Sequence, residues 1–160
     1  MDQELIDEFI SCLKRINHKS KVIVLPNRGE YKKLDVSSSK YSFFVDVNLK
    51  GRLGNITLML RNVNHQDKPL LRLDIAGPAH KNPDGDFEGA GEIIPCPHMH
   101  IAHPMYGTSI AYPITHEKVK LYLTKSDLHD LVLILRKFLE FINTGNIGNF
   151  EYLWQNQLDV

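Results

Sequence analysis

The chain has 160 residues, enough for one domain with its own hydrophobic core, and a composition of 42% hydrophobic and 24% charged residues excludes a disordered chain. Its 19 Lys and Arg residues balance 19 Asp and Glu residues, which argues against a strongly basic protein that binds nucleic acid without selectivity. No stretch approaches the roughly 18 apolar residues of a membrane span. We predict a single domain over residues 1–160, with a core at 3–145 and a C-terminal tail at 146–160.

The start of the chain, MDQELIDEFISCLKRI, is acidic and amphipathic, whereas a signal peptide has a basic start followed by an apolar segment. Apolar residues such as Ile6 and Phe9 recur at helical spacing, which predicts a surface helix at 3–17. Cys12 and Cys96 are far apart in the sequence, as is typical of free thiols in a reducing compartment. These features predict a cytoplasmic protein without a membrane partner.

Alternating apolar and polar residues in the middle of the chain predict an antiparallel sheet. VIVLP at 22–26 reads as a short strand. Residues 27–40 are polar, and Ser37, Ser38 and Ser39 among them are predicted to lie in a loop. The strands are expected at 41–49, 55–63, 70–77 and 98–103, with further candidates at 109–114 and 118–123. The connection at 77–95 is rich in Gly, Pro and Asp, and a loop of this length in a compact domain is commonly functional.

A second amphipathic helix is predicted near the C-terminus. Ser126 is expected to be its N-cap, and Gly145 to end it. The tail at 146–160 contains Trp154 and is expected to dock back on the core or to contact a partner. The order helix, strands, helix predicts an α+β fold, with an antiparallel sheet of about five or six strands flanked on one face by an N-terminal and a C-terminal helix.

The polar face of the predicted sheet carries most of the candidate functional residues. Residues i and i+2 of a strand share a face, so Arg72 lies beside Asp74, and His98 beside His100. If the two strands are neighbours, these four side chains converge. The loop between them adds His80, and it also carries Asn82, Asp84 and the N-P-D-G turn.

Three interpretations of this histidine-rich face compete: an ordinary solvated sheet face, a metal site, and metal-free acid–base chemistry. The third is favoured, because histidine titrates near neutral pH and arginine binds phosphate. It requires no cofactor. The predicted catalytic residues are His98, His100, Arg72, Asp74 and His80, and the predicted substrate-binding residues are Arg61, Asn82, Asp84, His103 and Tyr106. If a metal binds, its expected ligands are His80, Cys96, His98 and His100, with His103 or Asp74 as alternatives that could complete the shell.

The pattern R-x-D-x5-H-x-N-P-D-G, followed by P-H-x-H and A-Y-P, resembles an uncharacterised family of small bacterial and phage proteins. More distantly it is similar to the TumE-type toxins of toxin–antitoxin pairs. The resemblance covers about residues 40–115 and carries over to Arg72, Asp74, His80, Asn82, Asp84, His98 and His100. In the close family an aromatic residue commonly follows H-x-H by two positions. This chain has Ala102 there, so any base-stacking role passes to His103 or Tyr106.

The resemblance implies a small mobile-element or defence-related protein. The leading hypothesis is a metal-independent endoribonuclease toxin, with RNA as substrate and an antitoxin as partner. The alternative is a non-enzymatic phage or prophage protein that binds a host defence protein, and the third hypothesis is a zinc-binding protein. The sequence leaves the oligomeric state open, a dimer included.

Overall fold

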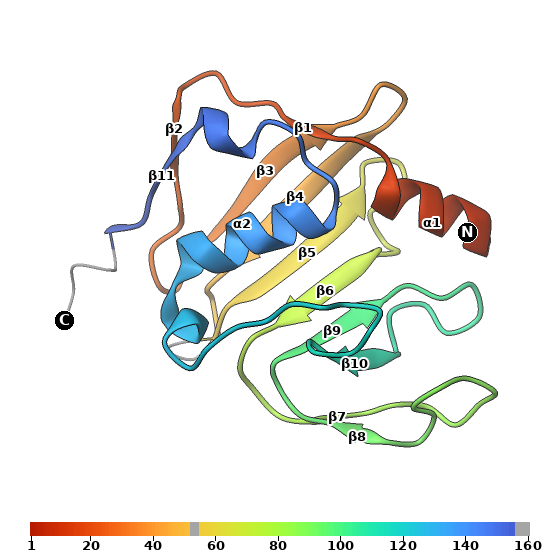
Figure 1. Cartoon of the computed structure of the whole chain (residues 1–160). Helices are drawn as coiled ribbons and strands as arrows, with labels where there is room; N and C mark the ends of the chain where they lie inside the picture. Colours follow the sequence, from red (N-terminus) through yellow and green to blue (C-terminus); the bar gives the residue numbers. More distant parts are fainter. Residues whose placement is uncertain (52–54, 156–160) are drawn as a thin grey trace.

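The computed structural model describes residues 1–51 and 55–155, and its centre is a seven-stranded antiparallel sheet with the strand order β1-β3-β4-β5-β6-β9-β10 (Figure 1). These strands are β1 (Arg15–Ile16), β3 (Tyr31–Ser37), β4 (Ser42–Asn48), β5 (Thr57–Asn62), β6 (Leu71–Asp74), β9 (His98–Ile101) and β10 (Ala111–Pro113). The α+β prediction is confirmed, with a sheet wider than the five or six strands expected.

One face of the sheet is the floor of the hydrophobic core. The alternation in the sequence places Val45, Leu58, Leu73 and Met99 on this face, and all four are fully buried. Their strands pair in register, Val47 with Leu58 and Leu73 with Met99, so the apolar side chains form one continuous layer. The residues between them lie on the opposite face, as predicted.

Two helices, α1 (Gln3–Ser11) and α2 (Leu131–Phe141), pack on the apolar face of the sheet (Figure 1). Each begins at an aspartate whose carboxylate accepts a backbone hydrogen bond: Asp2 caps α1 and Asp130 caps α2. The prediction that Ser126 is the N-cap of α2 is wrong. It precedes a separate 3-10 turn, η1 (Asp127–His129), because Asp130 adopts an extended conformation and starts the helix anew.

The helix predicted at 3–17 ends six residues early. Cys12 is extended, and Lys14 lies in a parallel bridge with Thr144 after α2. Its backbone donates to Asn143 O and accepts from Gly145 N, and its ammonium donates to three main-chain carbonyls. The apolar spacing does not reveal these long-range contacts. They stabilise the extended conformation of this segment more than its helical propensity stabilises a helix.

Local structure differs from the prediction at three places. Residues 27–40 contain the long strand β3, which was not expected from the sequence; Leu34 and Val36 supply its apolar face, and it pairs with β4 as far as Ser37, the first residue of the predicted loop. The strand at 109–114 is only the three residues of β10. Residues 118–123 form no strand: Lys120 has a φ of 54°, which interrupts extended backbone.

The connection at 77–95 is not a plain loop, because it contains the strand pair β7 (His80–Lys81) and β8 (Ile93–Ile94). It leaves the main sheet after β6 and returns to β9 (Figure 1). The Asn82 side chain, 1% exposed, ties it to the sheet: its amide donates to Gly89 O and Ala111 O, and its oxygen accepts from Ala111 N. The hairpin therefore lies against β10 and covers the end of the sheet.

The C-terminal tail docks back on the domain. After η2 (Ile147–Asn149), strand β11 (Glu151–Leu153) pairs in parallel with β2 (Val22–Val24), and Trp154 is buried. The rest of the predicted tail, 156–160, lies outside the described residues. Within residues 1–51 and 55–155, no helix is long and apolar enough to cross a membrane.

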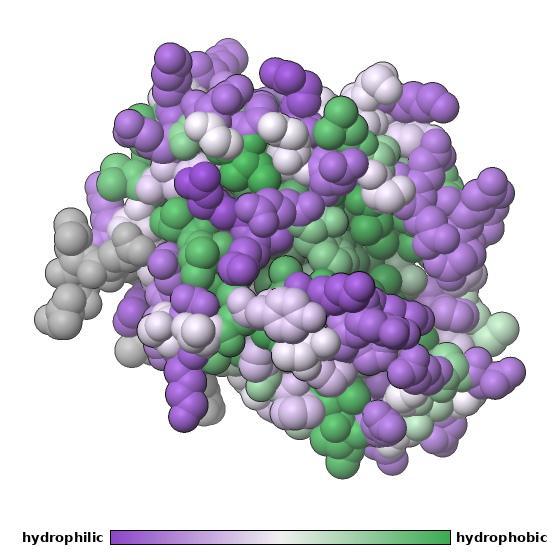
Figure 2. Space-filling view, in the orientation of Figure 1, coloured by the Kyte–Doolittle hydropathy of each residue, from purple (hydrophilic) through white to green (hydrophobic). Residues whose placement is uncertain are grey.

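The helical side of the molecule also has a hollow. Figure 2 shows hydrophobic side chains gathered between α1 and α2. A groove of about 330 Å³ lies there, with Leu71 and Ile101 of the sheet among its walls and Phe141 at the end of α2. The chemistry-bearing residues are on the opposite face of the sheet.

Candidate functional site

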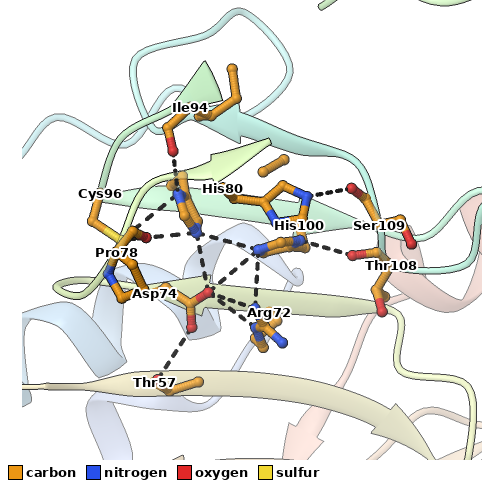
Figure 3. Close-up of polar contacts among 12 residues, drawn as sticks. Thr57, Arg72, Asp74, Pro78, His80, Ile94, Cys96, His100, Thr108 and Ser109 are labelled. Carbon is orange, nitrogen blue, oxygen red and sulfur yellow. Dashed lines mark hydrogen bonds and ion pairs between the residues drawn. The ribbon is translucent and has the colours of Figure 1, made fainter. Parts of the chain in front are cut away.

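The pairing of β6 with β9 gathers the predicted site residues. Arg72 lies opposite His100, and Asp74 lies opposite His98. Both pairs face away from the helices, because Leu73 and Met99 between them face the core. Figure 3 shows Arg72, Asp74 and His100 converging above the strands, and His98 Nε2 lies 3.2 Å from the Asp74 carboxylate. The predicted convergence of the two pairs is thus present in the structure.

Backbone carbonyls orient both histidine rings. His98 Nδ1 lies 3.1 Å from Ile94 O, and His100 Nδ1 lies 2.8 Å from Thr108 O. A carbonyl oxygen can only accept a hydrogen bond, so each Nδ1 carries a proton. In the neutral ring, Nε2 then has no proton and presents a lone pair. Each histidine side chain is only 2% exposed, so these lone pairs are directed into the protein.

The two Nε2 atoms and one carboxylate oxygen form a nearly regular triangle. Asp74 Oδ2 lies 3.2 Å from His98 Nε2 and 3.4 Å from His100 Nε2, and the two Nε2 atoms are 3.3 Å apart. With neutral histidines, all three atoms are acceptors. The Arg72 guanidinium donates to Asp74 Oδ2 and His100 Nε2, and a proton or metal ion between the three atoms would relieve the remaining repulsion of their lone pairs. Ligands about 2.1 Å from a tetrahedral ion lie about 3.4 Å apart. The triangle has the dimensions of such a coordination face.

Arg72 flanks the triangle on its accessible side. Its Nε and Nη2 each lie 3.0 Å from Asp74 Oδ2, and Nη2 is 3.2 Å from His100 Nε2. The other carboxylate oxygen, Oδ1, accepts from Thr57 Oγ1 at 3.2 Å. Burial alone would raise the pKa of Asp74, but its contacts with His100 and His98 and the charge and hydrogen bond of Arg72 hold this pKa well below its usual value. Asp74 is therefore a carboxylate at neutral pH.

A cleft of about 260 Å³ gives access to one side of the cluster. Its walls include Arg72, Asp74, His80, Cys96 and His98. The Arg72 side chain is 41% exposed and that of Asp74 is 15% exposed, whereas the histidines are almost fully covered. A ligand that enters the cleft therefore meets the guanidinium and the carboxylate before it meets the buried rings of His98 and His100.

His80, predicted as a third catalytic histidine, lies next to the cluster but outside the triangle. Its ring centroid is 4.7 Å from that of His100 and 6.2 Å from that of His98. Its Nε2 lies 2.7 Å from Ser109 O and so donates to this carbonyl. The hydrogen bond joins the loop to the segment before β10, which gives His80 a positioning role.

Cys96, a predicted metal ligand, also lies beside the cluster. Its Sγ is 3.7 Å from His98 Nδ1 and 3.8 Å from Pro78 O. Burial and the charge of Asp74 raise the pKa of the Cys96 thiol, so the sulfur is largely protonated at neutral pH and is a weak ligand in this state. Among the described residues, the group whose ligand atoms converge consists of Asp74, His98 and His100.

The residues predicted to bind substrate are dispersed. The Arg61 guanidinium is paired with Asp46 through two hydrogen bonds of 2.5 and 2.8 Å, on the same sheet face but with its own partner. Asn82 is a buried anchor of the hairpin. Asp84 is exposed at the N-P-D-G turn, and His103 Nδ1 accepts from a backbone N–H in the β9–β10 turn.

Tyr106 fixes the turn against the loop. Its ring packs on Phe87 with a centroid distance of 5.1 Å. Its hydroxyl lies so close to Gly85 that a Cβ at this position would collide with it. The glycine of the N-P-D-G turn is therefore required by close packing, and Tyr106 holds the loop in place.

Sequence reasoning missed three groups of the site. Thr57 orients Asp74, and the carbonyls of Ile94 and Thr108 orient the two histidines. The polar position of Thr57 on its strand was visible, but its pairing with Asp74 depends on the register of β5 with β6. Carbonyl groups are present at every residue, so no sequence signal distinguishes these two.

The fold and the cluster define a small α+β protein with a buried site of two histidines and one carboxylate, on the sheet face that the helices leave uncovered. The chain belongs to a family described as Family of unknown function (DUF6978), whose model matches residues 1–144. The match includes both helices and is therefore wider than the resemblance at 40–115. No curated protein and no solved structure matches the chain.

Proposed function

We propose that the chain is a metalloprotein that binds one divalent transition-metal ion through Asp74 Oδ2, His98 Nε2 and His100 Nε2. The observation that supports this proposal is the triangle of three acceptor atoms with edges of 3.2 to 3.4 Å. The Nδ1–H bonds to backbone carbonyls strengthen it, because metal-binding histidines commonly donate their second nitrogen in this way. Oxygen and imidazole ligands suit zinc or ferrous iron.

Three protein ligands leave at least one coordination position open. Structural zinc sites use four protein ligands, whereas catalytic sites keep a position for water or substrate. The cleft beside Asp74 and Arg72 provides the route to that position. The proposed role is therefore catalytic, in the class of metal-assisted reactions in which a bound water is activated or a substrate oxygen is polarised.

The second candidate is the metal-independent endoribonuclease. An extra proton on His98 would also relieve the repulsion in the triangle, and the exposed Arg72 beside His100 suits a phosphate. It ranks second because both nitrogens of each histidine face protein atoms in the buried cluster, whereas an acid or base must reach the proton that it transfers. The toxin role, the TumE likeness, the antitoxin and the alternative of a phage protein that binds a host defence protein stay predictions.

A metal titration tests the first candidate. Untagged protein stripped with a chelator should bind one equivalent of Zn²⁺ or Co²⁺ per chain, and Co²⁺ should give the visible absorption of a low-coordinate site. Calorimetry and the Co²⁺ spectrum measure this. Binding of less than about a tenth of an equivalent would end the proposal.

The stripped protein also tests the second candidate. Incubated with total RNA in the presence of a chelator, it should leave the RNA intact if the metal is required. Metal-free cleavage that His98→Ala abolishes would instead favour the ribonuclease.

A further inference from the structure

We infer that Arg72 is the anion-binding residue of this site, and that the cleft accepts a phosphate group which bridges Arg72 and the metal. The inference rests on the proposed metal site and names the class of its ligand: a small phosphate monoester, which has three non-bridging oxygens. Its basis is the position of one arginine between a buried ligand triangle and the solvent.

Arg72 is held at the edge of the triangle without being enclosed. Its Nε and Nη2 are tethered to Asp74 Oδ2 at 3.0 Å, but 41% of the side chain is exposed. An arginine that only neutralised Asp74 would be satisfied by this ion pair. The hydrogen bonds of Arg72 to Asp74 and His100 use Nε and Nη2, and the same side chain forms part of the wall of the cleft.

Metal binding would release a further donor of the same guanidinium. His100 Nε2 has one lone pair, and it now lies 3.2 Å from Arg72 Nη2. A lone pair given to a metal ion cannot also accept this N–H. The N–H would be left beside the metal without its partner, while Asp74 Oδ2 has a second lone pair to keep the tether. Arg72 would then be able to bind an anion next to the ion.

The charges favour an anion. Among the described residues around this cleft, Asp74 is the acidic one and Arg72 is the permanently cationic one. A divalent ion, one arginine and one carboxylate sum to about +2 in a partly buried site, and this attraction is little screened by solvent.

The number of oxygens favours phosphate over carboxylate. A carboxylate has two oxygens, and a forked pair with arginine uses both. A phosphate can give one oxygen to the metal and still present two to Arg72. A cleft of about 260 Å³ is at the small end of ligand pockets, so it holds the phosphate and a small adjoining group.

Calorimetry with inorganic phosphate as the probe tests the inference. Zn²⁺-loaded wild type should bind one phosphate per metal, and metal-free wild type should bind it about tenfold or more weakly. Arg72→Gln, in which an amide can still donate to Asp74, should keep its metal and lose phosphate affinity to a similar extent. Arg28→Gln, which removes an exposed arginine from a loop, should match the wild type.

The outcomes separate the two proposals. If the wild type takes up no metal, the proposed function fails and this inference with it. If the metal binds but phosphate does not, or binds equally well to Arg72→Gln per bound metal, only the inference fails. Acetate in place of phosphate gives a further check: binding as tight as that of phosphate would contradict the bridging geometry.

Discussion

Replacing His98 with alanine should reduce the bound metal from one equivalent to less than about a tenth at micromolar concentration. The loss of one of three ligands should cost more than the 10- to 100-fold in affinity that follows from changing an outer-shell partner. Asp74→Asn should act in the same direction, because the neutral amide is a weaker ligand and removes the negative charge that attracts the ion. Elemental analysis and Zn²⁺ competition against a chromophoric chelator measure both effects.

Control variants make this result specific. His129→Ala removes an exposed histidine and should bind metal like the wild type. Because His98 is buried, His98→Gln provides a variant of similar size, and circular dichroism checks that each variant is folded. Cys96→Ser and His80→Ala should keep the metal, since neither residue belongs to the triangle. A loss of metal in Cys96→Ser, with His98→Ala unaffected, would contradict the proposed ligand set.

Lys14→Met should lower the free energy of unfolding by about 3 kcal/mol or more. Lys14 is fully buried, and its ammonium donates to Ile10 O at 2.8 Å, Cys12 O at 3.0 Å and Ile142 O at 2.7 Å. Methionine fills a similar volume but leaves all three carbonyls without this donor, and each unsatisfied buried acceptor costs about 1–3 kcal/mol. Relief from burying a charge offsets part of the loss. Burial lowers the pKa of Lys14 to about 8, a measure of that cost.

Urea denaturation of Lys14→Met beside Lys19→Met tests this role. Lys19 is exposed in a turn, so its replacement should change the stability by no more than about 0.5 kcal/mol. Equal stability of the two variants would show that the three carbonyls find other donors. A loss in Lys14→Met alone would establish that one ammonium joins the ends of α1 and α2.

The sequence by itself determined which residues face the core and which carry the chemistry. Alternation placed Leu58, Leu73 and Met99 on the apolar face, and the same period of two put Arg72 beside Asp74 and His98 beside His100. These relations follow from the geometry of a single strand, so they need no knowledge of the neighbours. Helix ends were predicted less well, as Lys14 shows, because distant carbonyls hold its segment in an extended path.

Only the tertiary structure decided what the gathered residues form. The register of β6 with β9 places Asp74 opposite His98. Among the alternative ligands it therefore selects Asp74, and His80 and Cys96 lie outside the triangle. Hydrogen bonds from the two Nδ1 atoms to the carbonyls of Ile94 and Thr108 turn both Nε2 atoms inward. The alternation along the strand does not reveal these bonds. The register depends on the pairing of two strands that a long connection separates, and the ring orientation depends on the path of the chain before and after β9. A pattern along one strand holds no information about either.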